Sequence, residues 1–249
     1  MSAPESTDRS DRRVDEPDVT VGLVNVRDLG GLPTADGGRT RSRTLFRSDA
    51  PYEGDLDPAD LDGWPPATVI DLRGGRESQS FPRRWSGPVQ VINHQLYDRA
   101  QVGAVPVTRP LDDLYRSILR EVPERVAGAL SLFDPNGATL VHCAAGKDRT
   151  GIVIAIALTL AGVDADTVID DYQRTGPAVE HIVARLQQRS LIAADLALDV
   201  PVLGTPRAAI ELVLDVVTGA SGGAWGWLEH HGGDVPAVRG WVDGFVERT

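Results

Sequence analysis

Residues 138–151 read ATLVHCAAGKDRTG, and the case for a fold begins with this stretch. Its first five residues, ending at His142, are a short apolar run with β-branched members, which predicts a buried strand. From Thr150 to Ala161 the chain is almost wholly apolar and long enough for a buried helix. The sequence therefore predicts a strand that leads into a helix through one short loop.

The loop between these two elements holds residue types that suit an anion. Its backbone N–H groups lie at the start of a helix, which carries about half a positive charge. Small side chains let the backbone wrap closely around a tetrahedral group, and Arg149 can grip two phosphate oxygens. The residues expected to bind phosphate are Ala144, Ala145, Gly146, Lys147, Asp148 and Arg149.

Cys143 is the expected nucleophile of this loop. A free thiol has a pKa of about 8.5, and a helix N-terminus with nearby cations depresses such a pKa to about 3.5–7.5. A thiolate can attack phosphorus in line, and the positive loop stabilises the charge that develops on the phosphoryl oxygens. Thr150 can donate its hydroxyl to the sulfur when the sulfur leaves. This chemistry needs neither a metal ion nor a cofactor.

Cysteine and lysine each occur once in the chain, and both lie in this loop. The 25 basic residues are 24 arginines and Lys147, which lies four positions after the sole cysteine, Cys143. A lone cysteine excludes an internal disulfide and fits a reducing compartment, so a cytoplasmic location is expected. The N-terminal residues lack the apolar core of a signal peptide, which leaves secretion by another route open.

Charge and hydropathy exclude two classes of partner. The net charge of −11 argues against nucleic acid or an anionic membrane held by bulk attraction. The longest apolar stretch, residues 152–161, is too short to cross a bilayer, so no transmembrane segment is expected. A local basic pocket can still bind a small anion, because charges beyond about 8 Å are largely screened at physiological salt.

Strands alternate with helices in the first two thirds of the chain, and helices alone follow. The expected strands are residues 21–26, 44–46, 68–72, 89–96 and 138–142. The expected helices are residues 57–64, 111–122, 124–133, 150–161, 164–172, 178–190, 206–217, 224–231 and 235–246. This order predicts the α/β class with a helical C-terminal half. Residues 1–18 are polar and charge-rich, which predicts a disordered tail before one domain over residues 19–249.

The pattern His-Cys, five residues, Arg-Thr over residues 142–150 resembles the signature loop of the protein tyrosine phosphatase family. The filling Gly-Lys-Asp-Arg-Thr-Gly narrows the resemblance to a bacterial branch with lysine in this loop. Further matching stretches follow in the family's order at residues 25–31, 45–48, 69–73 and 170–172. The resemblance implies a central, mostly parallel sheet flanked by helices, and a phosphocysteine intermediate.

The resemblance also implies a substrate, with alternatives. Phosphotyrosine in proteins is the first expectation, and family members are also reported to act on phosphoserine, phosphothreonine and phosphoinositides. Phosphoinositide phosphatases carry lysine in this loop, where Lys147 could meet a second phosphate, so a lipid or dual-specificity phosphatase is the leading alternative. A module that binds phosphate without turnover is the third. Degenerate members commonly lose the cysteine or the arginine, whereas this chain keeps both.

The sequence offers two aspartates as the general acid. Asp98 follows the strand expected at residues 89–96, where related enzymes place an acid, whereas Asp148 lies inside the loop. We favour Asp98 on the sequence alone. Residues 178–203 are expected either to form a lid over the pocket or to include a plain packed helix.

The sequence also suggests contacts for three charged residues outside the loop. Arg27 and Asp28 are expected to pair with each other and hold a turn near the loop. Arg47 is expected to be solvated, as most arginines are in so arginine-rich a chain, or to contact phosphate at the rim.

Overall fold

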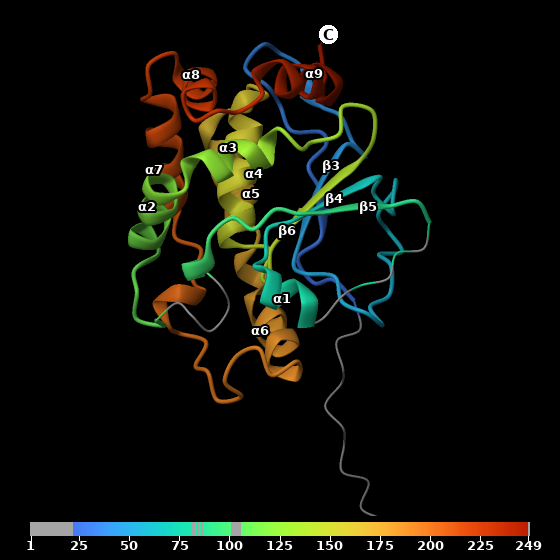
Figure 1. The fold of residues 1–249 in the computed structure, drawn as a ribbon, viewed down its shortest axis with the longest axis vertical. Helices are drawn as coiled ribbons and strands as arrows, with labels where there is room; N and C mark the ends of the chain where they lie inside the picture. The colour runs from blue at the N-terminus through green and yellow to red at the C-terminus, as the bar shows by residue number, and fades with distance from the viewer. Residues whose placement is uncertain (1–21, 81–82, 84, 86, 101–105, 249) are drawn as a thin grey trace, which may run out of the picture.

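The computed structural model describes residues 22–80, 83, 85, 87–100 and 106–248, so the tail expected over residues 1–18 lies outside the described residues. Within them the chain forms a five-stranded sheet in the order β1-β3-β6-β4-β5 (Figure 1). The strands are β1 Arg27–Asp28, β3 Leu45–Ser48, β6 Thr139–His142, β4 Thr68–Asp71 and β5 Gln90–Asn93. All neighbours are parallel except the edge pair β1 and β3. The predicted α/β fold with a mostly parallel central sheet is confirmed.

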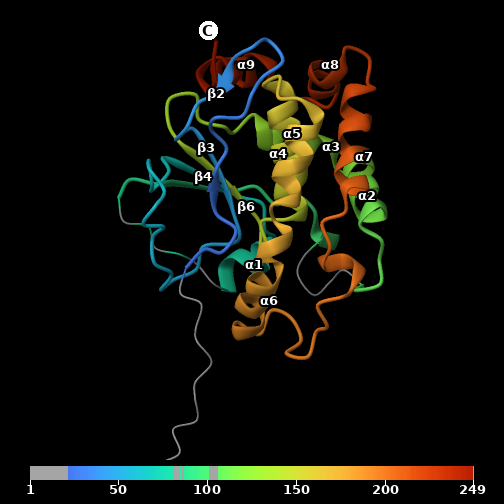
Figure 2. The same ribbon diagram turned by 180° about the vertical axis from the view of Figure 1, so that it is seen from behind.

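The two faces of the sheet are covered differently. Successive residues of a strand point to opposite faces, and the central strands are buried on both. One face joins the helices in the main core through Leu45, Ile70 and Val141. The other face packs under the irregular segment around Trp64 and Trp85 through Phe46, Val69 and Leu140. Figures 1 and 2 show the larger helices gathered on one side of the sheet.

The helix α4, Asp148–Leu160, lies at the centre of the helical layer. Nearly all its residues are buried, as expected of a helix that is apolar all round. It packs against α3, α5, α7 and α8. The other helices are α1 Gly75–Ser80, α2 Leu111–Glu121, α3 Pro123–Leu130, α5 Ala165–Gln173, α6 Val179–Gln188, α7 Arg207–Thr218, α8 Gly223–His230 and α9 Val235–Phe245. The C-terminal half is thus helical, as predicted.

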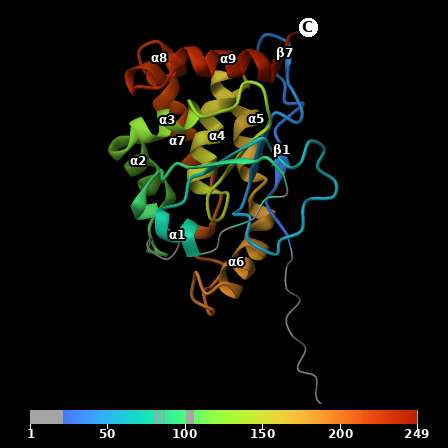
Figure 3. The ribbon, with the colours of Figure 1, turned by 45° about the vertical axis from the view of Figure 1, so that its right-hand side comes forward.

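A small second sheet joins the two ends of the described chain. β2, Arg39–Thr40, pairs antiparallel with β7, Val246–Glu247. β7 follows directly after α9, beside the N-terminal third of the chain (Figure 3). The pairing therefore fixes α9 against the N-terminal third.

The strand predicted at residues 21–26 is wrong. The strand there is β1, which begins only at Arg27. The backbone N–H groups of Val24 and Asn25 both donate to Asp49 Oδ1, at 3.0 and 2.9 Å. Both N–H groups therefore donate to one carboxylate oxygen and not to the carbonyls of a neighbouring strand.

The helix predicted at residues 57–64 is also wrong, and one helix was missed. Asp57 does not cap a helix, because its carboxylate accepts a hydrogen bond from the Trp64 indole at 2.8 Å and pairs with Arg83. Gly63 has a φ of +83°, which ends any helical path. The missed helix, α1, has only six residues, too few to show a period. The other predicted helices and strands agree with the structure to within three residues at each end, whereas the two-residue strands β2 and β7 were not predicted.

Candidate functional site

The loop of residues 143–147 joins β6 to α4, as the sequence predicts. β3 and β4 flank β6, so the carboxyl ends of three parallel strands meet at one edge of the sheet, where α/β proteins place their ligands. Cys143 and Arg149 are both buried, each with 2% of its surface exposed. The structure thus places the predicted nucleophile and the predicted phosphate-binding arginine at this edge.

The carbonyl groups of the loop are bound by donors that lie outside it. The carbonyl of Ala144 accepts the backbone N–H of Ala50 at 3.0 Å. The side-chain amide of Asn25 donates to the carbonyls of Ala145 and Gly146, each at 3.3 Å. Three successive carbonyls of the loop are therefore held by segments that precede it in sequence by about a hundred residues.

The backbone N–H groups of residues 144–147 differ from these carbonyls in their hydrogen bonding. None of them donates a hydrogen bond to any residue that the structure describes. In a trans peptide the C=O of one residue and the N–H of the next point in opposite directions. Because the carbonyls of residues 144–146 point toward their donors outside the loop, the N–H groups of residues 145–147 point the other way, toward the inside of the loop. Because α4 has no side-chain N-cap, its first amides are also left uncapped.

Gly146 occupies a position that no other residue fits. Its φ of +65° lies in the left-handed region. A Cβ atom there would lie 2.2 Å from the carbonyl oxygen of Ser48, at the end of β3. Arg47, the residue before Ser48, donates its Nη2 to the carbonyl of Gly146 at 2.8 Å. The loop therefore lies directly against β3.

A buried ionic cluster supports the loop from behind. Asp171 of α5 accepts hydrogen bonds from Arg47 Nη1 at 2.5 Å and Arg27 Nε at 2.7 Å. Burial opposes ionisation, but these two arginines hold the pKa of Asp171 below its usual range. The predicted Arg27–Asp28 pair is wrong, because Asp28 instead accepts the backbone N–H of Arg43. Arg47 is neither solvated nor at the rim, since only 1% of it is exposed.

Arg149 is oriented by a residue that the sequence analysis missed. Its Nη1 and Nη2 donate to the two carboxylate oxygens of Glu77, at 2.8 and 3.2 Å. Burial disfavours the charged guanidinium, but attraction to Cys143 and Glu77 raises the pKa of Arg149 above its usual value. Glu77 lies in the missed helix α1, in the first turn after a glycine pair. Its distance in sequence from the loop left no signal that would link the two.

Asp148 begins α4 and is held through one of its two oxygens. Tyr115 donates its hydroxyl to Asp148 Oδ1 at 3.0 Å, and Lys147 Nζ donates to the same atom at 2.6 Å. The Tyr172 hydroxyl lies 2.9 Å from that of Tyr115, which joins α2, α4 and α5 in one chain of contacts. The Asp148 side chain is 20% exposed, and Oδ2 has no hydrogen-bond partner among the described residues.

The ammonium group of Lys147 is buried. Besides Asp148, it donates to the carbonyls of Val202 and Gly204, at 3.0 and 3.1 Å. These carbonyls belong to the segment between α6 and α7. The single lysine of the chain therefore joins the loop to a segment more than fifty residues away.

Asp98 lies in a different setting. It begins a short 3-10 turn, Asp98–Ala100, and is exposed. The turn follows β5, which lies two strands from β6 in the sheet. No described residue makes a hydrogen bond or an ion pair with its side chain.

Two further residues close the site at its base. Thr150 is fully buried, and its hydroxyl has no hydrogen-bond partner among the described residues. His142 Nδ1 lies 3.2 Å from the carbonyl oxygen of Cys143 and 3.8 Å from Asp71 Oδ1. Burial lowers the pKa of His142 from 6.5 to about 4, although the charge of Asp71 opposes the shift. This histidine is therefore neutral at physiological pH.

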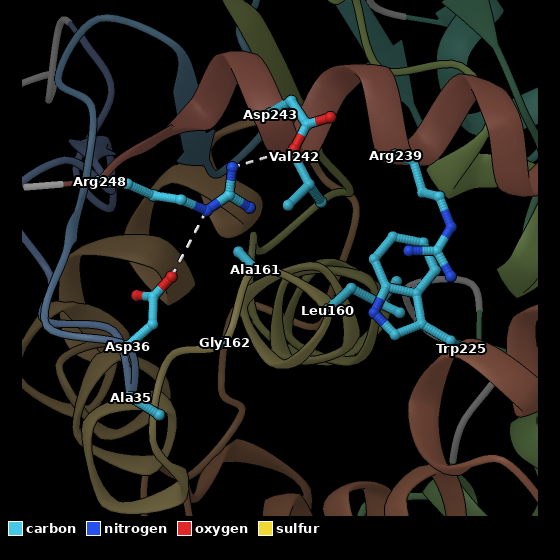
Figure 4. A pocket seen from close by; sticks show the side chains of 10 residues that line it. All are labelled: Ala35, Asp36, Leu160, Ala161, Gly162, Trp225, Arg239, Val242, Asp243 and Arg248. Atoms are coloured by element: carbon cyan, nitrogen blue, oxygen red, sulfur yellow. Dashed lines mark hydrogen bonds and ion pairs between the residues drawn. The ribbon is translucent and has the colours of Figure 1, made fainter.

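A hollow lies at the opposite end of α4, away from the loop (Figure 4). Leu160 and Ala161 line it at the end of the helix, and Arg239 stacks on Trp225 with its guanidinium carbon 4.3 Å from the ring centre. Because α4 has 13 residues, about 20 Å separate this hollow from the loop. The described residues contain no group of three or more His, Cys, Asp or Glu side chains that could hold a metal ion.

The described chain is an α/β protein in which a buried thiol begins the loop between β6 and α4. A model of the tyrosine phosphatase family matches residues 19–239, and the chain belongs to that family. The described residues include no helix with the length and apolar character needed to cross a membrane.

Three bacterial proteins are similar to this chain. The triple specificity protein phosphatase PtpB of Mycobacterium tuberculosis is 36% identical over 83 residues, which cover 32% of this chain and 30% of PtpB. A putative tyrosine-protein phosphatase of Cupriavidus necator is 27% identical over 228 residues, covering 84% of this chain and 80% of that protein. A tyrosine-protein phosphatase of Nostoc commune is 42% identical over 53 residues, covering 21% of this chain and 16% of that protein. The matched segment thus spans less than a third of PtpB and less than a fifth of the Nostoc protein.

We predict that His142→Gln makes the fold less sensitive to acid. In the unfolded chain the imidazole takes up a proton near pH 6.5, whereas the folded protein keeps it neutral down to about pH 4. Between these values the unfolded chain binds one proton more, so the free energy of unfolding falls as the pH falls. Urea midpoints at about pH 7, 5.5 and 4.5 measure this slope. Equal slopes in wild type and variant would show that His142 does not contribute.

Proposed function

We propose that this protein hydrolyses phosphotyrosine in proteins through a phosphocysteine intermediate on Cys143. The observation that carries the proposal is the polarity of the loop of residues 143–147. Its carbonyls are bound from outside, and its four successive amides have no partner among the residues that the structure describes. Converging free amides at a helix N-terminus form a binding site for a tetrahedral anion. The buried thiol at the start of the loop then lies next to the bound phosphate.

The first half-reaction forms the sulfur–phosphorus bond. The Cys143 thiolate attacks phosphorus, the bond from phosphorus to the tyrosine oxygen breaks, and a carboxylic acid gives its proton to the departing phenolate. The free amides and Arg149 stabilise the charge on the three remaining phosphoryl oxygens. The contact of Arg149 with both oxygens of Glu77 fixes the guanidinium plane beforehand.

The second half-reaction returns the enzyme to its starting state. The same carboxylate takes a proton from water, the water oxygen attacks phosphorus, and the phosphorus–sulfur bond breaks to release phosphate and the thiolate. The buried Thr150 hydroxyl has no other partner among the described residues, which supports a role as donor to the leaving sulfur. Neither half-reaction, as proposed, uses a metal ion.

We assign the general acid to Asp148, in place of the Asp98 that the sequence alone favours. Asp148 begins the helix that follows the loop, and both its hydrogen-bond donors act on Oδ1. Its Oδ2, which has no hydrogen-bond partner among the described residues, can carry the transferred proton. Asp98 is exposed, and no described residue orients it. A catalytic acid needs a fixed position within reach of the leaving oxygen, which favours Asp148.

The first prediction concerns the nucleophile. Cys143→Ser should lower the rate of phosphate release from a phosphotyrosine peptide by about a thousandfold or more, because a hydroxyl at neutral pH is a far weaker nucleophile than a thiolate. The variant should still bind the peptide, since the free amides and Arg149 are unchanged. Phosphate release and peptide binding by calorimetry measure the two properties separately.

Two other outcomes would contradict the proposal. If Cys143→Ser kept the wild-type rate, hydrolysis would not pass through this sulfur. If the wild type bound phosphotyrosine and released no phosphate, the protein would be a binding module. A soluble phosphoinositide assayed in parallel tests the lipid substrate, and a rate above that on the peptide would replace phosphotyrosine as the assigned substrate.

The second prediction separates the two aspartates by leaving group. Asp148→Asn should slow hydrolysis of a phosphotyrosine peptide by about 10²–10⁴-fold. It should slow an aryl phosphate with a much more acidic phenol far less, because that phenolate leaves without a proton. Asp98→Asn is the matched control, with both rates near wild type. The opposite pattern, with the leaving-group effect in Asp98→Asn alone, would return the acid to Asp98.

A further inference from the structure

The cations around the loop are already paired with carboxylates of the protein. Arg149 is paired with Glu77 through two hydrogen bonds. Lys147 is paired with Asp148 at 2.6 Å. Arg27 and Arg47 share Asp171, and Arg73 contacts both oxygens of Asp71. Each of these five cations thus has a carboxylate partner, although Arg27 and Arg47 share one, and the chain as a whole carries −11. Binding of a phosphate here rests on neutral amides more than on net charge.

Lys147 is the most fully engaged of these cations. Its ammonium has three protons, and three acceptors surround it: Asp148 Oδ1, the Val202 carbonyl and the Gly204 carbonyl. Only 3% of the residue is exposed. A second phosphate could bind this ammonium only after at least one of the three hydrogen bonds had broken.

The two carbonyls belong to a segment that makes few other hydrogen bonds to the rest of the described chain, although Val202 packs against the main core. It contains the 3-10 turn Pro201–Leu203 and is the orange loop that joins α6 to α7 in Figure 1. Its backbone bonds are mostly internal, such as Gly204 N–H to the Pro201 carbonyl at 3.2 Å. One bond to the rest of the backbone runs from Val202 N–H to the Val107 carbonyl at 3.4 Å. The lysine therefore supplies the shorter contacts between this segment and the loop.

We propose that Lys147 is a positioning residue that holds the Val202–Gly204 segment as a fixed wall beside the phosphate loop. It does not bind a second phosphate, so a further phosphate on the substrate adds no contact with this lysine. This inference rests on the proposed phosphatase function and deepens it. It replaces the expectation that Lys147 meets a second phosphate of a phosphoinositide head group. The lysine acts on the substrate through the wall and through Asp148.

Lys147→Met tests the proposal, because methionine keeps the length of the side chain and removes its charge and its donors. Two readouts are needed. Hydrogen exchange should become faster at the backbone amides of Val202, Leu203 and Gly204, while exchange in the middle of α4 stays unchanged. The kcat/KM values for a phosphotyrosine peptide and for a soluble inositol lipid with two phosphates on its ring should fall together, so that their ratio stays within about threefold of wild type.

Arg239→Met is the matched control for the loss of one positive charge. Arg239 is exposed and lies in the hollow at the other end of α4 (Figure 4). Its removal should leave both the exchange of the Val202–Gly204 amides and the substrate ratio at wild-type values. A change in either one would show that net charge, and not the contacts of Lys147, sets that property.

The contrary outcomes are distinct. If Lys147→Met lowered kcat/KM for the doubly phosphorylated lipid by about tenfold more than for the peptide, the lysine would be a phosphate ligand and the proposal would fail. If hydrogen exchange at the backbone amides of Val202–Gly204 were unchanged in Lys147→Met, the proposal that the lysine holds this segment would also fail. If the wild type released phosphate from neither substrate, the proposed function would fail, while hydrogen exchange would still decide whether Lys147 holds the segment.

Discussion

The structure depends on the outward binding of the loop carbonyls after β6. Ala50 and the Asn25 side chain hold the carbonyls of residues 144–146, and Arg47 adds a second bond to Gly146. Each bond turns the following peptide N–H to the opposite side. In our proposal, the anion site is therefore made of backbone groups that are in place before any substrate binds. Such preorganised dipoles need no rearrangement at the moment of reaction, which is why they stabilise a transition state efficiently.

The N-terminal segment has a part in the site that its place in sequence does not show. The backbone N–H groups of residues 24 and 25 donate to Asp49 and are not part of a strand. The side chain of Asn25 donates to a carbonyl of the loop. Behind the loop, the buried Asp171 pairs with Arg27 and Arg47. Removing one partner of such a buried pair typically costs about 3–5 kcal/mol, because the remaining charge is left buried and uncompensated.

The sequence predicted the fold class, the strand–loop–helix unit and the positions of Cys143 and Arg149, because those features are local. Period and composition are enough to place β6 and α4. The partners of the loop could not be predicted in the same way. Glu77 lies 72 residues from Arg149 and Asn25 lies 121 residues from Gly146. Such pairs are set by tertiary packing, and a single sequence carries no signal for them. The buried state of Lys147 depends likewise on carbonyls 55 and 57 residues away.

Amide chemical shifts during a titration with inorganic phosphate test the central claim most directly. The account predicts that the largest shifts occur at the amides of residues 144–147 and the first turn of α4, because no described residue accepts a hydrogen bond from these N–H groups. Amides elsewhere, including those that line the hollow beside Trp225, should shift little. Large shifts confined to other parts of the chain, with the loop amides unmoved, would show that the loop does not bind phosphate and would contradict the account.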